Sequence, residues 1–376
     1  MKGKLSNQNE LSVVKSSKRE NQYDLLRILC MTEVVFIHAV TSQNNQLQQF
    51  VLTVSGCAVP VFFMLSGAFT LGNKKILKNL KKYYLNKFYK IVLPTLIFSF
   101  LYILWEVFLK VRKEGFSCAG NFFFLLLEKW IATGISGNGY HLWFMSVIIF
   151  FYAVAPLLVV LKNYYKNIYI YIYIYITLYI VAFGQFYIFE ISSPYYIRWI
   201  FYLPVIMTGD LVKEMNKKHT NRFLFFTVLV FSIVLLTVEY LLKLELLQNS
   251  KNQFIYFLIH DGTRSNIVVD PETLQIFNLL FSVCIFYLFS NLQIKKNLSK
   301  LAEMSFYVYL IHYVLEGIVL SLMMKANIKF NLGFHLDSFF GFFVRAILVL
   351  LLSCLGAFLI LNIRNAFRKS FTEKIK

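Results

Sequence analysis

The 376-residue sequence has unusually few charged residues. Charged side chains make up 15% of the chain, whereas 58% of the residues are hydrophobic. Soluble domains average about 25% charged residues, and a single soluble core does not grow to this size with so little polar surface to cover it. The composition therefore excludes a soluble globular enzyme and a disordered protein, and it indicates a polytopic membrane protein.

Cysteine and acidic residues are also scarce. The five cysteines show no CxxC spacing and predict neither a disulfide framework nor a structural zinc site. The 19 acidic residues are outnumbered by 38 Lys and Arg, so the formal net charge is +19. Short basic runs alternate with apolar stretches of membrane-spanning length. This pattern argues against nucleic-acid binding and is typical of loops between membrane helices.

Ten apolar stretches approach or exceed the length of about 20 residues that crosses a bilayer as a helix. They are residues 23–41, 49–71, 91–109, 142–161, 167–183, 196–212, 223–242, 276–292, 303–324 and 339–361. With ten spans, the two tails and the loops on their side hold 26 Lys and Arg, and the other loops hold 9. The positive-inside rule then predicts a multi-pass protein of the plasma membrane with both termini in the cytosol.

The predicted organisation is one all-α transmembrane domain, residues 23–361, between two cytosolic tails, residues 1–22 and 362–376. The first tail is polar and basic and lacks the pattern of a signal peptide. Segment 168–176 alternates Ile and Tyr as a strand does. An open strand at membrane depth would leave backbone groups unpaired, so we predict a helix there.

The first span carries ionisable side chains, which are costly in a bilayer and mark functional sites by default. Arg27 and His38 are eleven residues apart, so they share one helix face, about 16 Å apart along the axis. Arg27 can hold a phosphate-bearing group, and His38 can take a proton from an alcohol. In the alternative interpretation, Arg27 snorkels to the interface beside Asp24 and His38 caps the helix. Glu33 lies about 140° around the helix from His38 and is expected to face another helix.

Four sequence blocks resemble the acyltransferase-3 family of integral membrane O-acyltransferases. Arg27 and His38, within the segment YDLLRILCMTEVVFIHAV, match the spacing of the family's Arg-X10-His motif. Three further blocks resemble family blocks in the family's order. They are VPVFFMLSGAF at 59–69, HLWF at 141–144 followed by Tyr152 and Pro156, and SFYVYLIH at 305–312. Within the family, the blocks are most similar to those of the surface-polysaccharide O-acetyltransferases.

The resemblance implies a reaction and its substrates. An acyl group, most often acetyl, would pass from acetyl-CoA or another acyl-CoA to a hydroxyl of a surface or cell-wall glycan or its lipid-linked precursor. The acyl-CoA is a co-substrate, and neither a bound cofactor nor a metal is expected. His38 would be the general base, while Arg27 would bind the donor or form the inner end of a polar seam.

Two hypotheses compete with an acyltransferase. A transporter or exporter of a polysaccharide or small polar solute would use the same buried charges as a permeation path. A non-catalytic membrane partner of a glycan-assembly complex would tolerate loss of His38.

Four other side chains are candidates for contact with the substrates. His141 opens the fourth span beside Trp143, where the two can contact the acceptor or belong to an interfacial His–Trp belt. His312 falls near the middle of the ninth span, where it can line the donor path or bond across helices. Arg198, near the outer end of the sixth span, can meet an anionic acceptor or snorkel to the interface.

Overall fold

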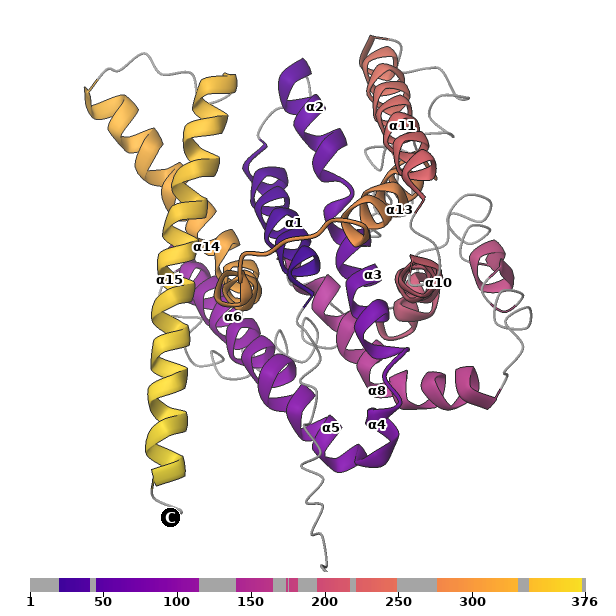
Figure 1. Cartoon of the computed structure of the whole chain (residues 1–376). Coiled ribbons are helices and arrows are strands. Elements are labelled where there is room, and N and C mark those ends of the chain that lie inside the picture. The colour runs from indigo at the N-terminus through magenta and orange to yellow at the C-terminus, as the bar shows by residue number, and fades with distance from the viewer. Residues whose placement is uncertain are drawn as a thin grey trace, which may run out of the picture.

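The computed structural model describes residues 20–40, 45–114, 140–164, 174, 176–181, 195–216, 221–248, 276–330 and 338–373. Within these ranges every regular element is a helix, and the long helices pack into one bundle (Figure 1). The predicted all-α fold is therefore confirmed.

Six helical stretches are long and apolar enough to cross a membrane. They are Gln46–Thr70, Leu80–Phe108, Trp143–Tyr164, Arg222–Glu245, Ser299–Lys329 and Phe339–Ala366, and a shorter apolar helix covers Ile276–Ser290. The predicted first and sixth spans are also helices, α1 (Asn21–Ala39) and α10 (Tyr195–Asn216), which carry charged residues. The chain is thus a multi-pass membrane protein, and about ten spans remain compatible with it. Most of the predicted fifth span lies outside the described residues.

Several helix boundaries differ from the predicted spans, and the last helix, Phe339–Glu373, continues twelve residues beyond the predicted end at 361. The second span is divided into α2 (Gln46–Ser55) and α3 (Ala58–Thr70). A side chain at Gly56, between them, would come within 2.8 Å of the Asn278 amide nitrogen. The third span begins earlier than predicted, because α5 (Leu80–Lys87) continues through the π-helix η1 (Phe88–Val92) into α6 (Leu93–Glu114).

The remaining elements complete the bundle. They are α4 (Lys75–Lys78), the 3-10 turn η3 (Tyr140–Leu142), α8 (Trp143–Tyr164), α11 (Arg222–Gln248), α13 (Ile276–Ser290), α14 (Ser299–Phe330) and α15 (Phe339–Glu373).

Contacts between helix ends define two sides of the bundle. The start of α1 meets the end of α3, with the rings of Tyr23 and Phe69 5.2 Å apart. The end of α1 meets the start of α15, with the rings of Phe36 and Phe342 5.9 Å apart. We call the side where α1 begins the basic side, because α4 and α5 place their lysines there, at the lower edge of Figure 1. The other is called the opposite side.

Two glycines allow α3 and α10 to pack with their backbones almost in contact. A Cβ at Gly67 would lie 1.8 Å from the carbonyl oxygen of Ile206, and one at Gly209 would lie 1.9 Å from that of Met64. Small residues permit this close approach, which supplies the van der Waals contact that holds membrane helices together. The pair fixes α10 against the centre of the bundle.

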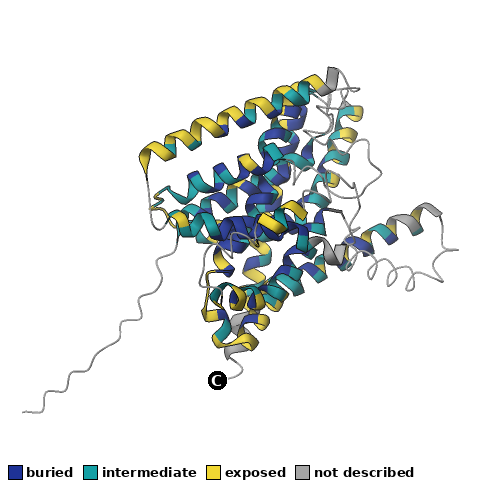
Figure 2. Cartoon of the chain, turned by 90° about the vertical axis from the view of Figure 1, so that its right-hand side faces the viewer, coloured by how far each residue is buried: buried dark blue, intermediate teal, exposed yellow. Residues whose placement is uncertain are grey.

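Buried residues line the interior of the bundle, and exposed ones follow its outward faces (Figure 2). On α11, Phe223, Phe226 and Val230 are more than half exposed, as expected for side chains in contact with lipid.

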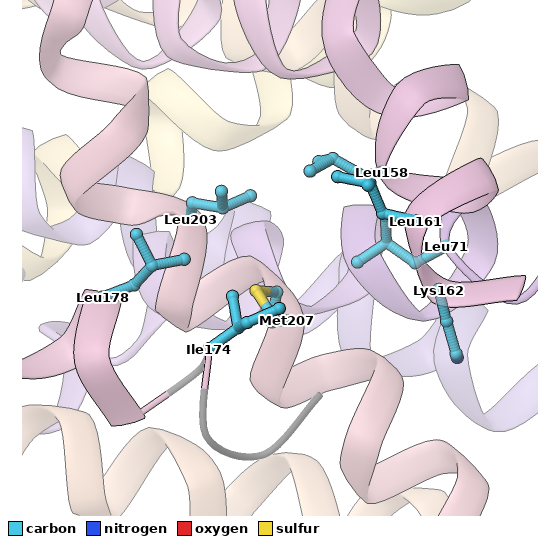
Figure 3. A pocket seen from close by; sticks show the side chains of 8 residues that line it. All are labelled: Leu71, Leu158, Leu161, Lys162, Ile174, Leu178, Leu203 and Met207. Atoms are coloured by element: carbon cyan, nitrogen blue, oxygen red, sulfur yellow. The ribbon is translucent and has the colours of Figure 1, made fainter. Parts of the chain in front are cut away.

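A small apolar pocket of about 50 Å³ lies between α8 and α10, where Leu158, Leu203 and Met207 line it (Figure 3). At its edge, the ammonium of Lys162 pairs with the carboxylates of Asp210 and Glu214. The cation is thus neutralised inside the fold.

Candidate active site

Three of the predicted site residues come together as a histidine cluster. His38 lies at the end of α1, His141 in η3 and His312 in the middle of α14. The ring centroids of His141 and His312 are 4.7 Å apart, those of His38 and His312 5.1 Å, and those of His38 and His141 6.1 Å. His141 is 4% exposed and His312 0% exposed, whereas His38 is only half-buried. His38 is therefore the ring most open to a substrate.

Three tyrosines pack around the histidine cluster. Tyr313 stacks on His141 at 5.3 Å between centroids and lies 5.7 Å from His38. Tyr309 and Tyr102 lie 5.1 and 5.4 Å from the ring of His141. The Tyr309 hydroxyl also donates a hydrogen bond to the backbone carbonyl of His141. The tyrosines therefore fix the position of His141 by both ring packing and hydrogen bonding.

Hydrogen bonds define the orientation of His312. Its Nδ1 lies 2.8 Å from the carbonyl oxygen of Tyr309 and 3.3 Å from that of Val308. Carbonyl oxygens only accept, so Nδ1 carries the proton. Within the described part of the chain, the buried Nε2 of His312 and both ring nitrogens of His141 have no hydrogen-bond partner. Such atoms are rare in folded proteins and are typical of sites that bind a ligand or water.

A cavity of about 280 Å³ leads from the basic side toward the histidine cluster. Arg27 of α1 and Lys87 of α5 both line it. Arg27 also pairs with Asp24 at 3.2 Å, so the pairing expected in the alternative interpretation is present while the guanidinium still borders the cavity. The Lys87 ammonium lies 3.3 Å from the ring centroid of Tyr152. The cavity thus presents two cations to any occupant.

Two neighbouring aromatic rings, those of Phe144 and Tyr309, form part of the cavity wall. Their ring centroids are 5.6 Å apart. On its other side Tyr309 contacts His141 and His312. Tyr309 therefore lies between the cavity and the histidine cluster, and we call the rings of Tyr309 and Phe144 the aromatic layer.

One face of α14 carries polar residues from the cavity to the far side of the cluster. Ser305 lines the cavity, followed by Tyr309, His312 and Glu316 at helical spacings of four, three and four residues. Beyond His312, the carboxylate of Glu316 lies 3.7 Å from Nε of Arg345, a side chain of α15 that is 0% exposed. This ion pair, in which Arg345 is buried and Glu316 half-buried, links α14 and α15 one helical turn beyond His312.

The other predicted site residues lie elsewhere. Trp143 packs against Phe63 and Tyr202, at 6.5 and 5.6 Å between centroids, toward α3 and α10. Arg198 is in α10, and its side chain lies outside the described residues. Glu33 faces another helix, as expected, and accepts a hydrogen bond from Cys57 with Sγ 3.7 Å from its Oε2.

Two contributors were missed in the sequence. Lys87 falls in a predicted loop, because the predicted third span, residues 91–109, begins after it. Tyr309 lies in the SFYVYLIH block three residues before His312, and that spacing was the available signal. No group of three His, Cys, Asp or Glu side chains among the described residues has the geometry to hold a metal ion.

The helical membrane bundle and the comparison with protein families together define a membrane acyltransferase. The family model described as "Acyltransferase domain" (Acyl_transf_3) matches residues 20–362. The chain belongs to the acyltransferase-3 family. Comparisons with curated proteins and with solved structures found no match.

Proposed function

We propose that the protein is an O-acyltransferase that moves an acyl group, most often acetyl, from acyl-CoA to a glycan hydroxyl. One observation carries the proposal. A cavity with Arg27 and Lys87 along its lining leads toward the histidine cluster in the centre of the bundle. The acceptor is a surface or cell-wall glycan or its lipid-linked precursor.

The donor side of the cavity suits coenzyme A. Arginine and lysine are the side chains that most often bind phosphate groups, and Arg27 and Lys87 supply one of each. The walls beyond them include Phe62, Leu65 and Ile148, which offer apolar contact to the pantetheine arm and the acyl group. Acyl-CoA is made in the cytosol, so the basic side faces the cytosol, in agreement with the distribution of positive charge.

His38 acts as the general base. It takes the proton of the acceptor hydroxyl while the hydroxyl oxygen attacks the thioester carbonyl. The carbon–sulfur bond breaks as the tetrahedral intermediate collapses, and the proton passes to the departing CoA sulfur. The products are an acyl ester of the glycan and free CoA. His141 and His312 hold the reacting groups in line beside His38.

The acceptor approaches from the opposite side, because α1 ends there one residue after His38, which is only half-buried. Trp143 and Arg198 remain candidates for acceptor contact at that side. Both termini are cytosolic and the bundle lies in the plasma membrane, where glycan precursors carried on lipid can reach it.

The test compares ester-linked acetate on surface glycans in a strain that lacks the protein and carries the wild type or His38→Ala. His219→Ala is the matched control, because this histidine lies in a predicted loop. We expect the wild type and the control to restore the ester, and His38→Ala at equal membrane abundance to fail. Full ester in the His38→Ala strain would contradict the role of His38. Unchanged ester in every strain, with altered solute flux, would support a transporter.

A further inference from the structure

The aromatic layer at the end of the cavity lies on the path between donor and base. If Arg27 and Lys87 bind the phosphates of acyl-CoA, the acyl group is the end of the donor that points toward the histidine cluster. Tyr309 and Phe144 both line the cavity, and Tyr309 in turn contacts His141 and His312. His38 lies beyond them, 5.1 Å from the ring of His312.

We propose that Tyr309 is a specificity-determining residue that limits the length of the acyl chain the enzyme transfers. The inference rests on the proposed function and adds the class of donor: acyl-CoA thioesters with a short acyl chain, acetyl first. For the thioester carbonyl to reach the cluster, the Tyr309 ring must turn aside far enough to admit an acetyl group. Each added methylene then requires a further displacement of that ring.

The Tyr309 ring is buried and packed, so a large displacement of it is costly. Tyr309 is 7% exposed, and its hydroxyl donates to the carbonyl of His141. Its ring also packs against that of His312, with the two centroids 5.8 Å apart. A displacement of the ring by a long acyl chain would therefore disturb both histidines. A well-packed interior resists such changes, because each added methylene forces side chains away from their preferred rotamers.

The experiment measures chain-length preference in membranes that contain the full-length protein and its native acceptor. Radiolabelled acetyl-CoA, butyryl-CoA and hexanoyl-CoA are supplied in turn, and ester-bound label is counted. We expect the wild type to favour acetyl. Tyr309→Ala should raise the ratio of hexanoyl to acetyl transfer by about tenfold or more, the range by which one or more methylenes are discriminated in a pocket. Tyr309→Phe keeps the ring and should keep the preference of the wild type.

The matched control is Tyr307→Ala. Tyr307 is on the same helix and is 4% exposed, but its hydroxyl accepts a hydrogen bond from Arg364 of α15. Loss of this ring should leave the hexanoyl-to-acetyl ratio unchanged, whatever its effect on abundance. If Tyr309→Ala does not accumulate, Phe144→Leu enlarges the same end of the cavity and should shift the ratio in the same direction.

Two outcomes would overturn the inference alone. One is an unchanged ratio in a Tyr309→Ala or Phe144→Leu protein that still transfers acetyl, and the other is an equal shift in Tyr309→Phe and Tyr309→Ala. A wild-type protein that transfers no acyl group from any of the three donors would instead overturn the proposed function. Transfer from acetyl-CoA by the wild-type protein therefore distinguishes a failure of this inference from a failure of the proposed function.

Discussion

His312 donates a hydrogen bond from Nδ1 to the carbonyl oxygen of Tyr309, one helical turn earlier, over 2.8 Å. This bond fixes both the rotation of the imidazole and the nitrogen that carries its proton. The other nitrogen, Nε2, is buried and is directed away from the bonded carbonyl. In the neutral ring Nε2 is then a hydrogen-bond acceptor within the histidine cluster.

This geometry predicts different effects for two amide substitutions of His312. His312→Gln places an amide near Nε2, whereas His312→Asn places one near Nδ1 and leaves the position of Nε2 empty. We expect His312→Asn to lower kcat about tenfold more than His312→Gln, a difference worth one hydrogen bond. The measurement is the kcat for acetyl transfer in membranes. Equal kcat values for the two variants, with only KM changed, would show that His312 contributes to donor binding instead.

Loss of the cavity cations should weaken donor binding rather than the chemical step. Arg27→Ala and Lys87→Ala should each raise the KM for acetyl-CoA by about tenfold or more, because a hydrogen bond to a charged group contributes about 1.5–3 kcal/mol. The kcat should change much less. The control is Arg222→Ala, a basic residue that is exposed at the start of α11. An unchanged KM in both cavity variants would contradict a phosphate site at Arg27 and Lys87.

The contact between α3 and α10 predicts a sharp difference between two glycine substitutions. Gly67→Ala places a Cβ 1.8 Å from a backbone carbonyl oxygen, so the two helices must separate. We expect a loss of stability of at least about 1–3 kcal/mol, the cost of overpacking. At Gly317→Ala the added Cβ meets nothing within 4 Å, so stability should be unchanged or slightly higher. Thermal unfolding in detergent compares the two, and equal melting temperatures would contradict the close contact.

The proposed orientation in the membrane predicts opposite labelling of two introduced cysteines. Leu47→Cys, at the start of α2, should react with an impermeant thiol reagent added outside intact cells. Lys78→Cys, in α4 on the basic side, should react only after the membrane is opened. Both positions are exposed. A Cys118→Ser background removes the native cysteine in a predicted outside loop. If Lys78→Cys, and not Leu47→Cys, is labelled in intact cells, the protein has the reverse of the proposed orientation.

Part of the site was predictable because it depends on a single helix. The eleven-residue spacing of Arg27 and His38 fixes their common face wherever α1 lies in the bundle. The same reasoning applies to His312 and Tyr309 on α14, although Tyr309 was not singled out. The cost of placing an ionisable group in a membrane then identifies the histidines as candidates.

The rest of the site depends on how helices pack, which spacing does not reveal. Lys87 borders the cavity because α5 and the π-helix η1 extend the third span backwards. The N-cap Asn79, which accepts a hydrogen bond from the backbone N–H of Lys82, marks the earlier start, but the lysines that follow it break the apolar pattern. Trp143 is only two residues from His141 in the sequence, yet it packs toward α3. His141 belongs to the 3-10 turn η3, whereas Trp143 is the first residue of α8. The contact of Gly67 with α10 requires knowledge of the neighbouring helix.

The aromatic layer at Tyr309 has a consequence for the energy metabolism of the cell. A membrane that stores a proton gradient cannot contain a continuous water-filled channel, yet this protein has a cavity of about 280 Å³ whose wall includes Tyr309, a neighbour of two imidazoles. Tyr309 of the aromatic layer lines that cavity and contacts the histidine cluster, so its ring lies between the two. The proposed acyl transfer across the bilayer can then proceed without an open water path, which preserves the gradient. An enlarged opening at this layer would let protons leak and would slow growth, even where acyl transfer is intact.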